Sequence, residues 1–180
     1  YLNFYINKTN EDAYNGVLSI ENFNIFLSGP KKSGKSFLSK LWSKKYKALM
    51  YDNNLELILN HSNNIIIDQK KIHNHEENIF HILNHCNLNN LRVLFISELK
   101  INEINIKLKD LNSRLKIFTE YIINKPDDDM LLNILTKLLI EKQFVINSHE
   151  IFNFIIKRAN RSYEEIYKIA NKLDLLSLEK

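Results

Sequence analysis

Short apolar runs alternate with segments of helical spacing through the first two thirds of the chain. Five runs have the length and content of buried strands: 23–28, 48–52, 64–68, 92–97 and 116–122. Between them lie segments whose apolar residues recur at helical spacing: 35–48, 54–60, 76–88 and 106–115. Strands that alternate with helices are typical of a parallel sheet covered on both faces. We therefore predict an α/β fold built on a five-stranded parallel sheet.

The pattern changes after residue 125, and only helical patterns follow from Met130 onwards. Three helices are predicted, each with a capping signal: Asp127 or Asp128 after Pro126, then Ser148, then Ser162 with Glu165 as a capping box. Apolar spacing predicts one buried face on the second and third helices: Ile151, Phe154 and Ile155, then Ile166, Ile169 and Leu173. We expect an α/β domain of residues 1–125 followed by a small three-helix domain of residues 126–180.

Composition narrows the class of protein. Apolar residues make up 44% of the chain, which is enough for a buried core and argues against a disordered chain. The apolar runs are too short to span a bilayer, and no signal-peptide pattern opens the sequence at Tyr1. A single cysteine, Cys86, cannot form an internal disulfide, which suits a reducing cytoplasm. The net charge of +4 is scattered, so it permits contact with nucleic acid without indicating it.

The sequence GPKKSGKS at 29–36 carries the clearest chemistry. It fits G-x-x-x-x-G-K-[ST], the phosphate-binding P-loop, and holds Gly29 and Gly34, two of the three glycines of the chain. Backbone N–H groups of such a loop surround a β-phosphate at a helix N-terminus, where the helix dipole favours an anion. Lys35 would reach the β- and γ-phosphates, and the Ser36 hydroxyl would ligate Mg²⁺. An ordinary strand-to-helix turn is the alternative.

The predicted nucleotide-binding segment is therefore continuous, with the side chains of Lys31 and Lys32 facing solvent. It comprises Gly29, Pro30, Lys31, Lys32, Ser33, Gly34, Lys35, Ser36 and Phe37.

A P-loop needs a second carboxylate at the end of a neighbouring strand to hold the magnesium shell. Asp68 ends the most apolar run of the chain and is predicted to take this role, the alternative being a helix cap or turn aspartate. Gln69 follows it, where ring-forming P-loop ATPases usually carry an acid. Because glutamine cannot act as a general base, autonomous hydrolysis should be slow or absent while binding survives.

The sequence allows two other interpretations, a metal site and a small-molecule kinase. A cluster of possible metal ligands follows the third strand: His73, His75, His81, His85 and Cys86. Neither H-E-x-x-H nor C-x-x-C spacing is present, so a solvated helix face is the better interpretation. A small-molecule kinase is an alternative on the P-loop alone, although the middle of the chain lacks an arginine-rich lid.

Over nearly its whole length the chain resembles the AAA+ module of the DnaA-like family, and within it the Hda-type regulators. The resemblance rests on five stretches: FLSGPKKSGKSFLSKLW, IIIDQ, RVLFISE, LKDLNSRL and the lid-like tail FIIKRANRSYEEIYKIANKLDLLSLEK. It also includes NFYINKTNEDAYN, which is similar to a segment beside the adenine and implies that Tyr5 and Ile6 contact the base. Glu98 falls where the family has its sensor 1 aspartate. Arg114 falls at the arginine finger, which acts on the nucleotide of a neighbouring subunit.

Two departures from the family bear on activity. Glu164 aligns with the lid arginine called sensor 2, with Arg161 three residues earlier, and Gln69 replaces an acid. Both fit a nucleotide-bound regulator with weak ATPase activity, and repulsion by Glu164 would favour ADP over ATP if its side chain points inward. The resemblance thus implies ADP or ATP with Mg²⁺ as cofactors, held at Ser36 and Asp68.

The resemblance also implies partners. They are DnaA, whose bound ATP would meet Arg114, and the sliding clamp, which Hda-type proteins bind through a peptide that would lie upstream of Tyr1. A homodimer is compatible with the family, direct DNA binding is expected to be weak or absent, and the location would be cytoplasmic. Two alternatives stay open: another DnaA-type adaptor or helicase loader, and a P-loop enzyme acting on a small molecule.

Overall fold

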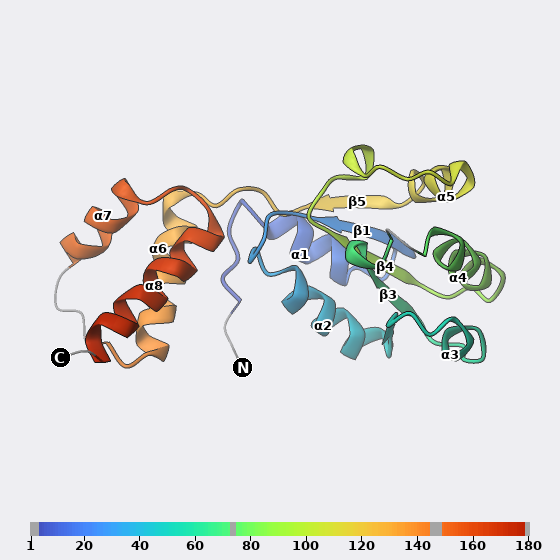
Figure 1. Cartoon of the computed structure of the whole chain (residues 1–180), viewed down its shortest axis with the longest axis horizontal. Coiled ribbons are helices and arrows are strands. Elements are labelled where there is room, and N and C mark those ends of the chain that lie inside the picture. The colour runs from blue at the N-terminus through green and yellow to red at the C-terminus, as the bar shows by residue number, and fades with distance from the viewer. Residues whose placement is uncertain (1–3, 73–74, 145–148, 179–180) are drawn as a thin grey trace.

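A five-stranded parallel sheet lies at the centre of the α/β part of the computed structural model (Figure 1). The structure describes residues 4–72, 75–144 and 149–178. The strands are β1 (Asn24–Ser28), β2 (Leu49–Met50), β3 (Ile65–Asp68), β4 (Val93–Ser97) and β5 (Thr119–Ile122). Their order across the sheet is β2-β3-β4-β1-β5. The predicted α/β fold and its five parallel strands are confirmed, although β2 is much shorter than the apolar run 48–52.

Helices cover both faces of this sheet because alternate strand residues point to opposite sides. On one face Ile25 and Leu27 pack with α1 (Glu11–Leu18) and α2 (Lys35–Tyr46). On the other face Phe26 packs with α3 (Leu55–Leu59), α4 (Glu76–Leu88) and α5 (Lys109–Leu115). Two short 3₁₀ turns, η1 (Gln69–Lys71) and η2 (Ile101–Glu103), follow β3 and β4.

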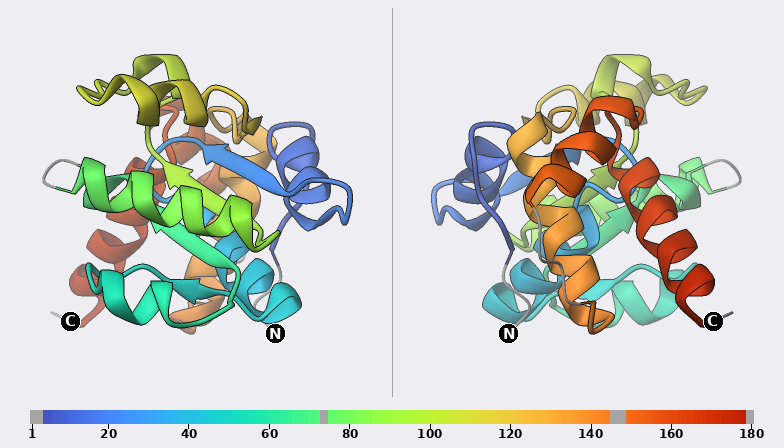
Figure 2. Two further views of the ribbon diagram at one scale, coloured as in Figure 1. Left: turned by 90° about the vertical axis from the view of Figure 1, so that its right-hand side faces the viewer. Right: turned by 90° about the vertical axis from the view of Figure 1, so that its left-hand side faces the viewer.

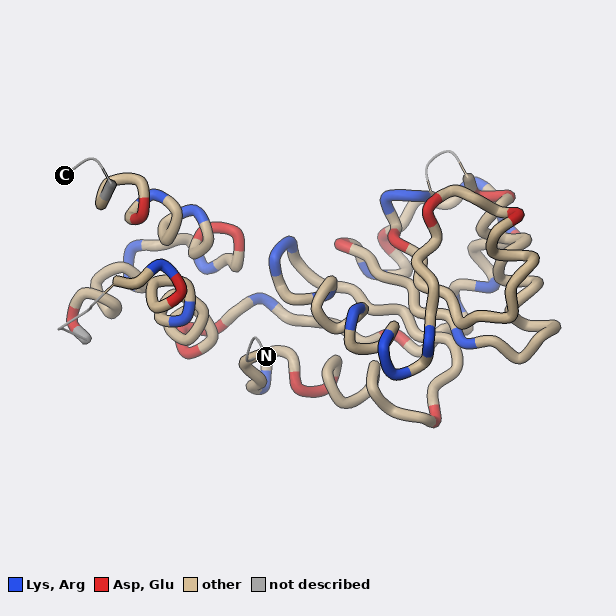
Figure 3. The backbone as a smooth tube through the Cα atoms, turned by 90° about the horizontal axis from the view of Figure 1, so that it is seen from below, with Lys and Arg blue, Asp and Glu red and all other residues tan. Residues whose placement is uncertain are grey.

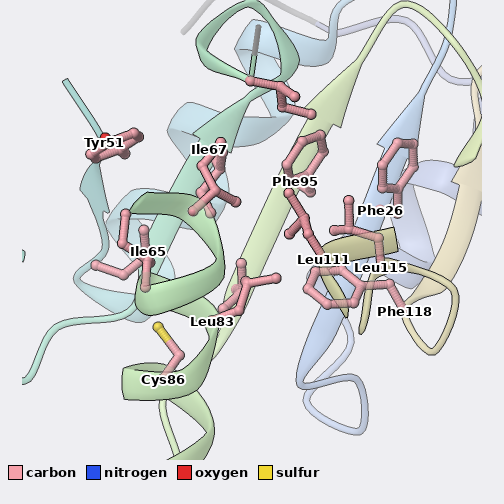
Figure 4. Close-up of a cluster of buried hydrophobic side chains, with 14 of the residues drawn as sticks. Phe26, Tyr51, Ile65, Ile67, Leu83, Cys86, Phe95, Leu111, Leu115 and Phe118 are labelled. Carbon is pink, nitrogen blue, oxygen red and sulfur yellow. The ribbon is translucent and has the colours of Figure 1, made fainter. Parts of the chain in front are cut away.

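The core on the second of these faces is drawn in Figure 4. The rings of Phe26 on β1 and Phe95 on β4 stack with their centroids 5.0 Å apart. Leu111 and Leu115 of α5 are fully buried against them. Cys86 lies at the same core, where burial raises the pKa of its thiol to about 12, so the cysteine is an inert packing residue.

Helix α1 was not predicted from the sequence. Its Gly16 packs so closely on β5 that an added Cβ would lie 2.0 Å from the Tyr121 ring. Ala13 and Val17 of the same helix are fully buried. The helix has only 8 residues and its buried residues are small, so tertiary packing decides its formation.

The remaining helices form a group of their own, shown in red and orange in Figures 1 and 2. They are α6 (Asp128–Glu141), α7 (His149–Arg158) and α8 (Tyr163–Leu178), and we call residues 128–178 the helical lid. Their shared core contains Leu131, Leu135, Leu139, Phe152, Ile156, Ile166 and Ala170. No strand occurs in the part of this segment that the structure describes, as predicted.

The predicted caps are partly seen. The Asp127 carboxylate accepts a hydrogen bond from the Met130 N–H at 2.8 Å, which makes Asp127 the N-cap of α6. The Ser162 hydroxyl accepts one from the Glu165 N–H at 3.2 Å, which is half of the expected capping box. Ser148 lies outside the described residues.

The buried face predicted for α7 is wrong at Ile151 and Phe154, although Ile155 does pack against the core of the lid. Ile151 and Phe154 are 52% and 57% exposed, whereas Phe152 and Ile156 are buried. The helix therefore packs through a pair at i and i+4, and the Arg158 guanidinium covers the exposed Phe154 ring at 3.7 Å. Helix α7 has two rows of apolar residues, and only contacts with the rest of the fold decide which row is buried.

Charges are interspersed over the whole molecule, as Figure 3 shows for Lys, Arg, Asp and Glu. Neither the α/β part nor the helical lid carries one sign alone, which agrees with the scattered charge of the sequence. Of the helices in the described ranges, none is both long and apolar enough to cross a membrane.

Candidate nucleotide-binding site

The predicted site residues meet at the edge of the sheet where the parallel strands end. The P-loop follows β1, Asp68 ends β3, and Glu98 follows β4. Residues from all three strand ends line one open cavity of about 830 Å³, which we call the loop cleft. Its walls include the P-loop residues 31–36, Asp68, Gln69 and Glu98. Crevices of this kind, beyond the carboxyl ends of parallel strands, are where α/β proteins bind ligands.

The P-loop joins β1 to α2 through glycines that the geometry requires. Gly34 is the N-cap of α2 with φ of 100°, a value that other residues rarely adopt. A Cβ on Gly29 would lie 2.9 Å from the Ile123 carbonyl oxygen. The first N–H groups of α2 have no partners within the helix, so the turn directs free donors towards the loop cleft. This arrangement suits an anion.

Lys35 is held inside the loop. Its Nζ donates hydrogen bonds to the carbonyls of Gly29 at 2.6 Å and Pro30 at 2.7 Å. Burial lowers the pKa of the Lys35 ammonium, whereas Glu98 and Asp68 act to raise it. The sequence prediction that Lys35 serves the loop therefore has a geometric basis: its cation sits within the turn that would surround a phosphate.

Asp68 has two features that the sequence left as alternatives. One carboxylate oxygen accepts a hydrogen bond from the Lys70 N–H at 2.9 Å and caps η1. The residue also lines the loop cleft together with Ser36. Capping uses one acceptor position of a carboxylate that has several, so the cap and a role in a magnesium shell are compatible.

Hydrogen bonds hold Gln69 and Glu98 at the strand ends beside Asp68. The Gln69 side-chain oxygen accepts hydrogen bonds from the Ser97 hydroxyl at 2.7 Å and the Glu98 N–H at 3.1 Å. These bonds tie the end of β3 to the end of β4. The Glu98 carboxylate lies 3.8 Å from the Lys70 ammonium. Gln69 is thus a structural crosslink at the floor of the cleft.

A second, smaller cavity of about 270 Å³ lies between the P-loop and the helical lid, and we call it the lid cleft. The Phe4 ring stacks on Phe37 with centroids 4.9 Å apart and planes 5° from parallel. Tyr5 also lines this cleft, and its hydroxyl donates to Asp129 of the lid at 2.6 Å. Ile6, the other residue predicted beside the base, is 38% exposed and is not part of the lining.

The residues fit the groups that the sequence implies. The Ser33 hydroxyl is buried without a hydrogen-bond partner, and Ser33 lines both clefts. A buried hydroxyl without a partner costs roughly 1–3 kcal/mol, which a ligand oxygen at this position would offset. Aromatic walls suit a purine ring, and the oxygens of Ser36 and Asp68 are the ligand type that Mg²⁺ prefers.

The structure adds lid residues that the sequence reasoning missed. Tyr163 and Tyr167 on α8 both line the lid cleft, as does Phe4 from the N-terminal segment. The spacing of the two tyrosines, i and i+4 on one helix face, was the available signal. The sequence does not show that this face of α8 meets the P-loop, because the P-loop lies more than a hundred residues earlier in the chain.

The condition under which Glu164 would repel a γ-phosphate, a side chain that points inward, is not met in the structure. Glu164 pairs with Lys168 on the same helix at 3.4 Å and lines neither cleft. Arg161 pairs with Asp128 at 3.1 Å near the start of α6.

Arg114 lies away from both clefts. It is near the end of α5, which leads into the start of β5, so it belongs to the opposite edge of the sheet from the P-loop (Figure 1). The guanidinium lies 5.3 Å from the centre of the Phe80 ring and is partly exposed. Across the described ranges no ion pair joins Arg114 to Asp110, the structural alternative that its spacing suggested.

Among the described residues no group of three or more His, Cys, Asp or Glu side chains could hold a metal ion, and His73 lies outside them. His85 instead approaches the His61 carbonyl at 3.3 Å.

The sequence matches no protein-family model, and no curated protein matches it. Solved structures do resemble the fold. A DNA replication initiation factor is 18% identical, with a TM-score of 0.78, covering 98% of this chain and 63% of that one. AMPPCP-bound DnaA from Aquifex aeolicus is 16% identical, with a TM-score of 0.76, over 98% of this chain and 64% of that one.

Domain III of DnaA from Thermotoga maritima has a TM-score of 0.74 at 16% identity, covering 91% of this chain and 82% of that domain. The chain thus spans less than two thirds of the first two structures. Together the sheet order, the P-loop and these likenesses show that the chain has the fold of the AAA+ domain of DnaA.

Proposed function

We propose that this chain binds an adenine nucleotide and regulates DnaA-dependent initiation of replication. The observation that carries the proposal is the loop cleft, in which the P-loop, Asp68 and Glu98 converge at the carboxyl edge of the sheet. The likeness to AMPPCP-bound DnaA supports adenine as the base, because that protein holds an ATP analogue in the same fold.

The expected contacts follow from the chemistry of each side chain. Lys35 would exchange its two carbonyl partners for β- and γ-phosphate oxygens, which are stronger acceptors for an ammonium. Ser36 and Asp68 would hold Mg²⁺. Tyr5, Phe37 and the aromatic residues of the lid would enclose the base, with Glu98 near the phosphate end.

Weak hydrolysis by the chain itself is part of the proposal. Gln69 cannot accept a proton from water, and its oxygen already accepts two hydrogen bonds. No arginine or lysine of the described lid residues lines the loop cleft. Nucleotide binding without turnover suits a regulator, because the chain then stays in its nucleotide-bound form.

Arg114 is the proposed contact with the partner's nucleotide. A finger that acts in trans has to lie away from its own cleft, and its position near the amino edge of the sheet meets that requirement. No ion pair with Asp110 holds Arg114 in the described part of the chain, and its guanidinium lies over the Phe80 ring instead. DnaA with bound ATP is the proposed partner, and the sliding clamp is expected to bring the two together.

The test is stimulation of ATP hydrolysis in trans. Arg114→Ala protein, as the full-length chain, is added to ATP-loaded DnaA with sliding clamp and DNA, and phosphate release is measured. Fingers of this kind contribute about 10³–10⁵ in rate, so the variant should fold and bind ADP normally yet fail to stimulate.

Lys116→Ala is the matched control, because it removes an exposed cation two residues further along and should stimulate as the unmodified protein does. Equal stimulation by Arg114→Ala and the unmodified chain would make Arg114 a structural residue. Stimulation by neither would reject the regulatory role and leave a helicase-loader or metabolic role to be tested.

A further inference from the structure

The two clefts are joined at one place. Within the described ranges, the residues that line both are Lys32, Ser33, Gly34 and Tyr167. Three of these belong to the P-loop, and Tyr167 comes from α8 of the helical lid. Tyr167 is therefore the residue of the helical lid that faces the P-loop where the lid cleft meets the loop cleft, which Lys35 and Asp68 line.

A contact already connects the two sides of this passage. The Lys32 ammonium lies 5.5 Å from the centre of the Tyr167 ring, within the range of a cation–π interaction. Lys32, which the sequence predicted to face solvent, is exposed but directed at the lid. The pair holds α8 against the P-loop at the position where a nucleotide would pass from base to phosphates.

Tyr167 is a neutral group at physiological pH. Burial, and then the nearby Glu141 carboxylate, raise the pKa of its hydroxyl above the ordinary value of 10.0. A neutral phenol can donate one hydrogen bond to a phosphate or ribose oxygen and can pack its ring beside a base. It cannot balance the charge of a γ-phosphate as an arginine does.

We propose that Tyr167, and not Glu164, is the lid residue that contacts the bound nucleotide, where base and phosphates join. The proposal rests on the proposed nucleotide binding and adds a specificity-determining residue to it. Because the contact is uncharged, the lid should distinguish ADP from ATP only weakly. The lid then closes over either nucleotide, which fits a chain that holds nucleotide without hydrolysing it.

The experiment adds a cation at each candidate position. Tyr167→Arg and Glu164→Arg are compared with the unmodified full-length chain by calorimetric titration with Mg²⁺ and either ADP or the non-hydrolysable AMPPCP. Charged hydrogen bonds are strong, so Tyr167→Arg should raise affinity for AMPPCP relative to ADP by about tenfold. Glu164 lines neither cleft, so Glu164→Arg should change that ratio by less than about twofold.

Loss-of-function variants give a second measurement. Tyr167→Ala should weaken ADP binding by about fivefold or more, whereas Glu164→Ala should leave it unchanged. Circular dichroism and thermal unfolding are recorded for each variant, so that loss of fold is separated from loss of contact. Tyr167→Phe keeps the ring and its contact with Lys32, so it isolates the hydroxyl.

The outcomes separate this inference from the function on which it rests. One result would overturn the inference alone: the unmodified protein binds ADP, Lys35→Ala weakens that binding, and Tyr167→Arg and Tyr167→Ala both behave as the unmodified protein. Tyr167 would then have no such role, while the P-loop function would stand. A larger change of the AMPPCP to ADP ratio in Glu164→Arg than in Tyr167→Arg would also overturn the inference. If the unmodified protein binds neither nucleotide, the proposed function and the inference fall together.

Discussion

The two walls of the candidate site are built from different chemistry. The P-loop wall presents backbone N–H groups, the Lys35 ammonium and the carboxylates of Asp68 and Glu98. The lid wall presents mainly rings and aliphatic side chains, among them Met130, Ile134, Tyr163 and Tyr167. It also carries Lys137 and Glu141, which form an ion pair with each other at 3.9 Å. One wall is suited to hold charge, and the other is suited to cover an apolar ring.

This difference separates affinity from catalysis. Burial of an aromatic base on the lid wall contributes binding energy that is equal for the ground state and the transition state. Catalysis of phosphoryl transfer requires charge stabilisation as the γ-phosphate leaves, and in many enzymes a mobile cation supplies it. The one lysine of the lid wall, Lys137, is paired with Glu141, and no lid cation lines the loop cleft among the described residues, so the chain is expected to bind nucleotide well and hydrolyse it poorly.

The largest expected effect is therefore on turnover. The chain alone should hydrolyse ATP far more slowly than about 1 per second, the low end of the usual range for enzymes. The reason is that Gln69 offers no base and that Glu164 and Tyr167 offer no cation. A steady-state phosphate-release assay with a Lys35→Ala blank measures it. A rate well above this bound would mean that the lid wall supplies charge in solution.

A smaller effect, on the stability of the fold, is expected where the helical lid is tied to the N-terminal segment. Asp127 caps α6 and accepts a hydrogen bond from the Asn7 side chain at 3.0 Å, so it ties the helical lid to the N-terminal segment. Asp127→Ala should lower the free energy of unfolding by about 1 kcal/mol, the usual cost of a lost N-cap. Asp127→Asn keeps an acceptor and should recover most of it. Urea unfolding of both variants gives the difference.

The same residue predicts a pH dependence. Burial acts to raise the pKa of the Asp127 carboxyl, but the Met130 N–H, Asn7 and the Lys8 ammonium outweigh it and hold that pKa below 3.8. A depressed folded-state pKa means that the stabilisation is complete above the unfolded value and is lost as pH falls through the folded value. The stability gap between the unmodified chain and Asp127→Ala should thus narrow below pH 3.8. A gap that stays constant there would show that the charge of Asp127 contributes nothing.

The P-loop wall was predictable from sequence and the lid wall was not. Gly29, Gly34 and Lys35 lie within seven residues, so local spacing is enough to specify their geometry. Asp68 is predictable because the most apolar run of the chain ends at it, although the sequence does not decide between its role as a cap, seen in the bond from the Lys70 N–H, and a role in the magnesium shell. Each of these signals is contained in one short stretch of chain.

Tyr167 depends on which face of α8 meets a loop far away in the sequence. The apolar pattern of α8 gave the buried Ile166 correctly but did not say what covers the neighbouring positions. The same ambiguity produced the wrong buried face on α7, where Phe152 packs inward and Phe154 does not. Helices with two apolar stripes are settled by tertiary contacts, which composition and periodicity do not contain.

The central claim is that the P-loop wall binds a nucleotide, and one titration tests it most directly. Mg²⁺ and ADP are titrated calorimetrically into the unmodified full-length chain, into Lys35→Ala, and into Lys40→Ala as a control that removes an exposed cation from the same helix. We expect saturable binding by the unmodified chain and Lys40→Ala, and affinity at least about tenfold lower, about 1.4 kcal/mol, for Lys35→Ala. Equal affinities in Lys35→Ala and the unmodified chain would contradict the account.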